Sequence, residues 1–133
     1  MSVRVVTLLL IGLGGAAGSM ARYLLSGWVQ QFSAAALPLG TLSVNLAGCF
    51  FIGLLNTALT GPLLIREEQR LALVVGVLGG FTTFTAFGWE TLELLRGGQH
   101  LAAVGNVLVS VFAGLAAVWL GARLATTWLG GGG

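Results

Sequence analysis

The sequence predicts an all-α membrane protein with four transmembrane helices, because it has few charges, long uncharged stretches and short loops. Of its 133 residues, 56% are hydrophobic and only 8% are charged. A soluble domain carries about 25% charged residues. So few charges cannot cover a surface that faces water, and most of the chain is therefore expected to face lipid.

The uncharged stretches place the four spans. They cover residues 5–21, 23–65, 71–89 and 97–122. About 20 apolar residues cross a bilayer, and one isolated segment satisfies its own backbone hydrogen bonds in lipid only as a helix. We expect helices at roughly 4–28, 38–61, 68–95 and 99–126. They form one four-helix domain over 1–129, followed by a disordered glycine tail at 130–133.

The charged residues are all arginine or glutamate, and they barely favour one orientation in the membrane. With four spans, one side carries Arg4, Arg66, Arg70 and Arg123, and the other carries Arg22 and Arg96. Four against two, with Glu67 and Glu68 beside the larger group, is a weak positive-inside signal. The chain is therefore expected to insert either way round. The arginines form no basic stripe, which argues against a nucleic-acid partner.

The residue sets that enzymes and metal sites use are not found in this sequence. The one histidine, His100, lies near a helix end, and the four glutamates lie in a loop or at the end of the third span. They assemble into neither a Ser–His–acid set nor a set of metal ligands. We therefore expect no catalytic residues. The one cysteine, Cys49, is expected to be a packing residue.

Polar residues inside the spans carry most of the functional signal. Thr41 and Asn45 are four apart in the second span, and Asn106 and Ser110 are four apart in the fourth, so each pair shares a helix face. Such stripes either line a wet path or hold helices together by hydrogen bonds. Arg22, near the end of the first span, has two interpretations as well. It reaches the lipid headgroups, or it forms an electropositive vestibule that attracts anions.

The third span is unusual in its middle. Paired glycines at 79–80 are followed by Thr82 and Thr83, which is poor material for a helix. Unwound backbone at this depth is tolerated where it lines a cavity, and its freed carbonyls can coordinate a cation. Phe84 and Phe87 are three apart and point the same way. Their rings have positive edges that would favour an anion without a fixed charge, although the same spacing also fits packing or lipid-facing residues.

Two glycine pairs predict close helix packing. Gly14 and Gly18 form a G-x-x-x-G motif in the first span, and Gly76 and Gly80 repeat the spacing in the third. Such pairs let backbones approach closely. We expect these surfaces to take part in a homodimer.

Three stretches of the sequence resemble motifs of the Fluc (CrcB) family of fluoride channels. They are G-G-A-A-G-S-M-A-R-Y at 14–23, P-L-G-T-L-S-V-N-L-A-G at 38–48 and G-V-L-G-G-F-T-T-F-T-A-F-G-W-E-T at 76–91. The third is the most specific, and the resemblance covers nearly the whole chain. It implies an antiparallel, dual-topology homodimer with two narrow pores. Such a protein passively exports fluoride across the inner or plasma membrane and lowers intracellular fluoride.

The resemblance also implies roles for individual residues. Phe84 and Phe87 match the pore-lining phenylalanines, Asn45 the pore asparagine, with Thr41 one turn away, and Ser110 a pore hydroxyl of the fourth helix. Asn106 stands where some members carry a pore tyrosine, and Gly114 where some carry a hydroxyl. Arg22 matches the arginine of the first helix. Gly79 and Thr82 match the third-helix break, whose backbone carbonyls hold a structural Na⁺ at the dimer axis.

Two other functions compete with a fluoride channel. A proton-coupled small multidrug exporter has a similar size, but it needs a carboxylate embedded in the membrane. The first span has none, and Glu90 is expected near a helix end. A non-transporting membrane assembly subunit would show the packing glycines, but it would not need the phenylalanine pair or the asparagines inside the spans.

Overall fold

The computed structural model describes residues 2–33, 37–61 and 63–129, and all regular structure in them is helical. Three helices are long: α1 (Ser2–Gln30), α2 (Leu39–Leu59) and α6 (His100–Trp128). The third span is a run of four segments, which we call the third run. Its segments are α3 (Glu67–Leu71), η1 (Ala72–Leu78), α4 (Gly79–Phe81) and α5 (Phe84–Arg96).

The four predicted membrane spans are confirmed. Four helical stretches are long and apolar enough to cross a bilayer, at Arg4–Gln30, Leu39–Leu59, Glu67–Arg96 and His100–Trp128. Their ends lie within two residues of those expected from the sequence. The predicted glycine tail at 130–133 falls outside the described residues.

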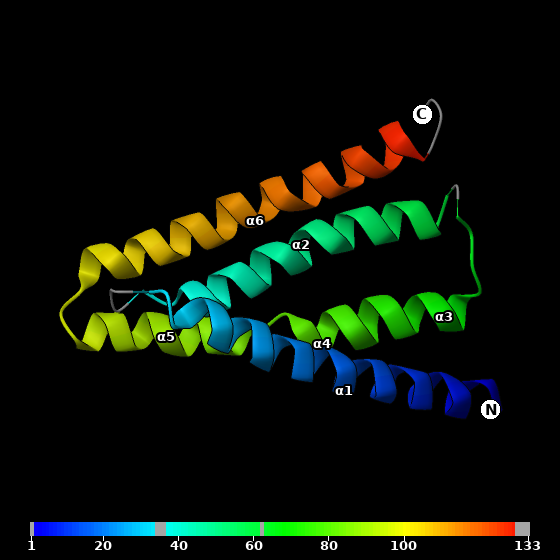
Figure 1. Ribbon diagram of the computed structural model, residues 1–133, viewed down its shortest axis with the longest axis horizontal. Coiled ribbons are helices and arrows are strands. Elements are labelled where there is room, and N and C mark those ends of the chain that lie inside the picture. The colour runs from blue at the N-terminus through cyan, green and yellow to red at the C-terminus, as the bar shows by residue number, and fades with distance from the viewer. Residues whose placement is uncertain (1, 34–36, 62, 130–133) are drawn as a thin grey trace.

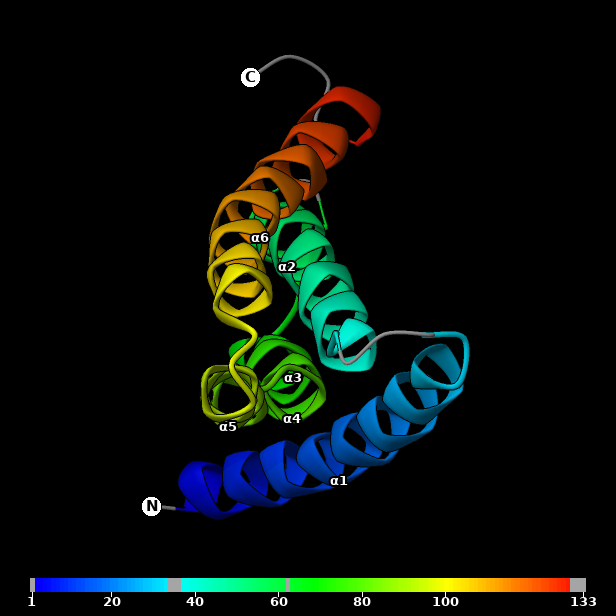
Figure 2. The same ribbon diagram turned by 90° about the vertical axis from the view of Figure 1, so that its left-hand side faces the viewer.

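The helices form two layers. Figure 1 shows α2 and α6 side by side in one layer and α1 beside the third run in the other. Figure 2 shows α1 passing across the face of the third run that points away from α6. The start of α1 and the end of α6 lie at the same end of the bundle, as expected for an even number of spans. The third run is therefore held between α1 and the layer formed by α2 and α6.

Glycines set how closely the helices approach. A Cβ atom on Gly53 would collide with the carbonyl oxygen of Val118, and one on Gly121 with that of Phe50, so α2 and α6 touch backbone to backbone. In the other layer, the predicted close-approach glycines face one another across α1 and the third run. They are Gly14, Gly18, Gly76 and Gly80. Their close backbone contacts lie within one chain, between α1 and the third run.

The segment η1 is a π-helix, which widens each turn by one residue relative to an α-helix. It packs against α1, where Gly76 approaches the backbone of Ile11. The sequence predicted a helix over 68–95 but gave no sign of the wider turn. Close backbone contact with α1 accompanies the wider turn. Gly79 has helical backbone angles (φ −62°, ψ −38°), so the helical path continues into α4.

The described chain buries little apolar volume by itself. Val44 is the only large side chain that is fully buried among the described residues. Leucine, phenylalanine and tryptophan side chains are exposed along the outer faces of α1 and α6, among them Leu13, Phe112 and Trp119. Such surfaces suit lipid or another protein chain rather than water.

Candidate functional site

The third run is interrupted at two residues in its middle. α4 ends at Phe81 and α5 begins at Phe84. Between them, Thr82 (φ −85°, ψ 158°) and Thr83 (φ −150°, ψ 115°) have extended backbones. Thr82 finishes the first half, because its N–H and its hydroxyl both donate to the Leu78 carbonyl, at 2.9 and 3.0 Å. Thr83 caps the second half, because its hydroxyl accepts from the Ala86 N–H at 3.1 Å.

The interruption leaves two backbone carbonyls without hydrogen-bond donors. In a continuous helix the Thr83 N–H would donate to the carbonyl of Gly79, four residues earlier. Here the Thr83 N–H donates to the side chain of Asn45 instead, at 2.8 Å. Within the described part of the chain, the carbonyl oxygens of Gly79 and Thr82 accept no hydrogen bond. Both are predicted sodium ligands.

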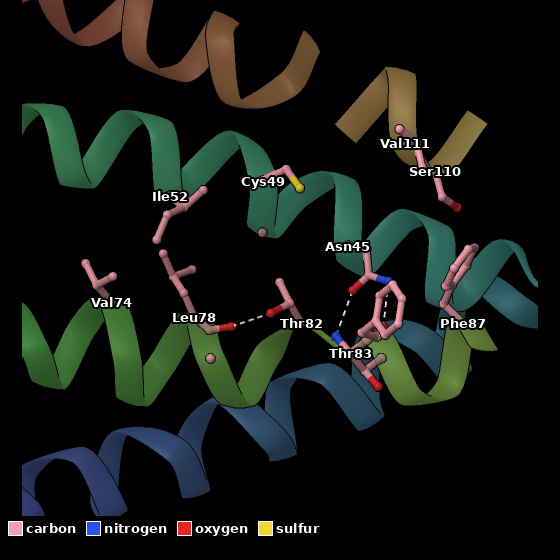
Figure 3. Close-up of a pocket in the computed structure, with 13 residues that line it drawn as sticks. Asn45, Cys49, Ile52, Val74, Leu78, Thr82, Thr83, Phe87, Ser110 and Val111 are labelled. Atoms are coloured by element: carbon pink, nitrogen blue, oxygen red, sulfur yellow. Dashed lines mark hydrogen bonds between the residues drawn. The ribbon is translucent and has the colours of Figure 1, made fainter. Parts of the chain in front are cut away.

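A groove of about 400 Å³ lies beside the interruption, between α2, the third run and α6. We call it the central groove. It brings together six of the predicted site residues, namely Asn45, Gly79, Thr82, Phe84, Phe87 and Ser110. Figure 3 shows side chains from all three elements converging on it. None of the thirteen residues that line it is charged.

The two predicted phenylalanines form a pair at this groove. The ring centroids of Phe84 and Phe87 are 5.4 Å apart, and the ring planes are tilted by 47°. Phe84 is 81% exposed, whereas Phe87 is half-buried. A ring as exposed as that of Phe84 leaves both its face and its edge open to another chain or to an ion.

Asn45 is fixed by two hydrogen bonds to one residue. Its side-chain nitrogen donates to the Thr83 carbonyl at 2.8 Å, and its side-chain oxygen accepts from the Thr83 N–H, also at 2.8 Å. Figure 3 shows the side chain reaching from α2 to the interruption, with one bond from each end of the carboxamide. The predicted pore asparagine therefore contacts the third run directly.

Thr41 and Asn106 do not line the central groove. Both are buried, with 7% of each residue exposed. The Thr41 hydroxyl donates to the Glu90 carboxylate at 2.7 Å, and the Asn106 side-chain nitrogen donates to the Thr91 hydroxyl at 3.0 Å. These bonds tie α2 and α6 to neighbouring positions of α5.

The side chain of Arg22 contacts the third run. It is half-buried, and its Nε donates to the Gly80 carbonyl at 3.1 Å. This bond connects α1 to α4, two residues before the interruption. The sequence left open a headgroup contact or a vestibule, and the structure adds a third role, as a brace on the third run.

The match to known proteins is extensive. A family model described as "CrcB-like protein, Camphor Resistance (CrcB)" matches residues 9–122. The chain belongs to this family. The resemblance found in the three motifs is therefore confirmed.

Relatives of this CrcB-like chain are similar over nearly their whole lengths. A protein of Solibacter usitatus is 53% identical over 117 residues, which cover 88% of this chain and 96% of the relative. A protein of Geobacter metallireducens is 48% identical over 86% of this chain and 93% of its own length. One of Chloroflexus aurantiacus is 46% identical over 93% of this chain and 98% of its own length. All three are named fluoride-specific ion channel FluC, a non-enzymatic function.

The environment of Glu90 in this CrcB-like chain was not predicted from the sequence. Glu90 was expected near the end of the third span, but it lies in the middle of α5 and is half-buried. One carboxylate oxygen accepts from Thr41, and the other is buried without a hydrogen-bond partner among the described residues. Glu90 also lines a second cavity of about 380 Å³, together with Ser26, Gln30 and Glu93. The sequence places Thr41 on the same helix face as Asn45, which indicated that Thr41 faces another polar group. It could not show that this group is the Glu90 carboxylate.

Among the described residues, no group of three or more His, Cys, Asp or Glu side chains could hold a metal ion.

Proposed function

We propose that this chain is a fluoride-selective channel that lets fluoride leave the cell passively across the inner or plasma membrane. Support comes from relatives that carry this name along nearly the whole chain, and from four helices able to span a bilayer. Passive exit fits a cell interior that is negative and that accumulates the ion. The consequence for the cell would be a lower fluoride concentration inside.

The observation that carries this proposal is the composition of the central groove. It offers a carboxamide at Asn45, a hydroxyl at Ser110 and the ring edges of Phe84 and Phe87. Fluoride is small and strongly hydrated, so a pore must replace water with donors of this kind. No fixed charge lines the groove. A charge there would bind the ion too tightly to release it, whereas conduction needs weak binding at several sites.

The remaining predicted residues extend this path. Thr41 lies one helical turn from Asn45 on α2, and Asn106 lies one turn from Ser110 on α6. Both Thr41 and Asn106 are buried polar residues. We assign them to the same conduction path as the groove. Arg22 supplies a positive charge on the far side of the interruption, in the vestibule that attracts the anion.

We further propose that two copies assemble as an antiparallel homodimer with two pores. One chain leaves the central groove open and the ring of Phe84 largely exposed. A second copy related by a two-fold axis would cover both, because such an axis joins the same surface of each subunit. The weak arginine bias fits a chain that inserts in both orientations.

Sodium fits at the axis of this dimer. The carbonyl oxygens of Gly79 and Thr82 lack donors among the described residues, so they are available to a cation. Two copies would supply four neutral oxygens, which is too few and too weakly charged for Ca²⁺. The interruption at Thr82 and Thr83 would then be the third-helix break of the family. The ion would be structural, because it would lie between the pores.

A second function receives support from Glu90. This carboxylate lies inside a candidate membrane span, and a proton-coupled exporter needs such a group. The central groove has no carboxylate, which favours the channel.

Efflux from liposomes that hold the purified full-length protein tests both functions. A channel should release fluoride when a potassium ionophore balances charge, should retain chloride, and should need no proton gradient. Release that stops when the proton gradient is collapsed, or equal release of chloride, would contradict the channel. Empty liposomes are the control for leakage.

A further inference from the structure

We infer that Asn45 is a positioning residue, whose carboxamide holds the third run open at Thr82 and Thr83. The effect of this role on conduction rests on the proposed function, because the groove beside the interruption is the proposed pore. The structural half rests on the two hydrogen bonds between Asn45 and Thr83.

The geometry of this pair is specific. In an extended residue, the N–H and the C=O point to the same side of the backbone, as they do where two antiparallel strands exchange both bonds. Thr83 is extended, and both of its backbone groups meet the side chain of Asn45 at 2.8 Å. A primary carboxamide offers one donor and one acceptor in the matching arrangement. Asn45 thus takes the place of a neighbouring strand.

Without Asn45, the groups of Thr83 would lack partners in the membrane interior. The natural acceptor for the Thr83 N–H is the Gly79 carbonyl, and reaching it requires closing the interruption into a continuous helix. An unpaired backbone group in lipid is strongly unfavourable. Asn45 therefore decides between two arrangements of the third run, one open with the Gly79 carbonyl free, and one closed.

The pairing also fixes what Asn45 presents to the central groove. A carboxamide can rotate by half a turn and exchange its oxygen and nitrogen. Here the Thr83 N–H requires an acceptor, so the oxygen must face it and the nitrogen must take the Thr83 carbonyl. The nitrogen keeps one further N–H. Thr83 thereby ensures that Asn45 offers an anion a donor whose direction is set.

Residue-resolved amide exchange measures the pairing without relying on conduction. The full-length protein, labelled with ¹⁵N and solubilised in detergent, would be followed by NMR. In the unmodified chain the Thr83 amide should exchange more slowly than that of Phe84, which starts α5 and has no acceptor among the described residues. Equal exchange at the two amides would overturn the inference, even if no variant of Asn45 folds.

Two variants sharpen the test. Asn45→Ala should speed exchange at Thr83 by a factor between about 3 and about 20, the range that one interhelical hydrogen bond supports. Asn45→Asp keeps the acceptor and should leave this amide slow. Ser43→Ala, on the same helix but outside the groove, is the matched control and should have no effect. If the run closed in Asn45→Ala, the Thr83 amide would stay slow, but the Phe84 amide would then bond to the Gly80 carbonyl and become slow as well. Unchanged rates at both Thr83 and Phe84 would overturn the inference.

Fluoride efflux from the same preparations separates this inference from the proposed function. Faster exchange at Thr83 together with reduced efflux in Asn45→Ala supports the positioning role. Reduced efflux with unchanged exchange would mean that Asn45 acts only by contacting the ion, which contradicts that role. If the unmodified protein released no fluoride, the proposed function would fail, while slow exchange at Thr83 would still support the pairing.

Discussion

The Nε atom of Arg22 donates a hydrogen bond to the carbonyl oxygen of Gly80 over 3.1 Å. The bond crosses from α1 to α4, and Asn45 contacts the other side of the interruption from α2. Two side chains from different helices therefore hold the backbone before and after Thr82. The interruption is fixed from both sides and does not depend on its own sequence alone.

Removing this brace should weaken the fold. Arg22→Ala leaves the Gly80 carbonyl without its charged donor, and we expect a loss of about 1 kcal/mol in the free energy of unfolding. Titration with a denaturing detergent, followed by circular dichroism, measures the loss. Arg123→Ala is the control, because this exposed side chain on α6 makes no described bond to another helix. Equal effects of the two substitutions would show that the bond to Gly80 contributes nothing specific.

The aromatic pair should control the rate of fluoride transport. Phe84→Ile and Phe87→Ile keep apolar bulk but remove the positive ring edge. We expect efflux to fall roughly tenfold, which corresponds to about 1.4 kcal/mol on the barrier. Phe112→Ile, at an exposed position of α6 away from the groove, should conduct like the parent. Parental rates in both groove variants would exclude a role for the ring edges.

The bond between Thr41 and Glu90 should show energetic coupling. Thr41→Val removes the hydroxyl that donates to the carboxylate, whereas Glu90→Gln keeps an acceptor for it. We expect Thr41→Val to be the more destabilising of the two. A double-mutant cycle with Glu90→Ala should give a coupling of about 0.6 to 1.7 kcal/mol in detergent unfolding. Additive effects would mean that the two side chains do not stabilise each other.

Close packing of α2 on α6 can be tested with two glycines of the same helix. A Cβ atom on Gly121 would collide with the Phe50 carbonyl, so Gly121→Ala must push the helices apart. We expect destabilisation of about 1 to 3 kcal/mol. Gly105→Ala is the matched control, because nothing lies within 4 Å of its Cβ position. A loss of stability in Gly105→Ala as large as in Gly121→Ala would point to helix flexibility rather than to the close contact.

Orientation in the membrane can be read from single cysteines at the two ends of the bundle. In a Cys49→Ala background, Gln31→Cys places an exposed thiol after α1, and Leu64→Cys places one between α2 and α3. One span separates the two positions, so they lie at opposite ends of the bundle. A membrane-impermeant reagent applied to whole cells should label about half of each population, because the positive-inside signal is weak. Complete labelling of one variant and none of the other would contradict the antiparallel dimer.

The four spans followed from the sequence because burial in lipid leaves a signal in composition and length alone. The hydrogen-bond partners of the polar side chains could not be predicted from the sequence, because they depend on how the helices pack against one another. The i,i+4 spacing put Asn45 on one face with Thr41, but Thr83 and Glu90 lie 38 and 49 residues further along the chain. Arg22 was expected near the end of the first span, but it lies eight residues before the end of α1. Its hydrogen bond is to a backbone carbonyl, which no side-chain pattern reveals.

The glycine pairs illustrate the same limit. The G-x-x-x-G spacing at Gly14 and Gly18 predicted a close backbone approach, which the structure shows. The spacing did not say whether the approaching helix belongs to the same chain or to another. Here Ala72 and Val77 of the same chain fill that position. The groove brings together residues of the second and third motifs, among them Asn45, Thr82 and Phe87, and it adds Ser110 from outside the motifs.

The π-helical turns of η1 set the rotational phase of everything that follows them in the third run. Each residue of an α-helix turns the chain by about 100°, and a π-helix fits one more residue under each hydrogen bond. If the seven residues Ala72–Leu78 formed an α-helix at unchanged length, they would rotate the chain further than the π-helix does. Thr83, Phe84 and Phe87 would then be turned by about that angle away from α2 and α6. The π-helical conformation of η1 thus decides which residues meet the ion, although η1 contributes few side chains to the groove.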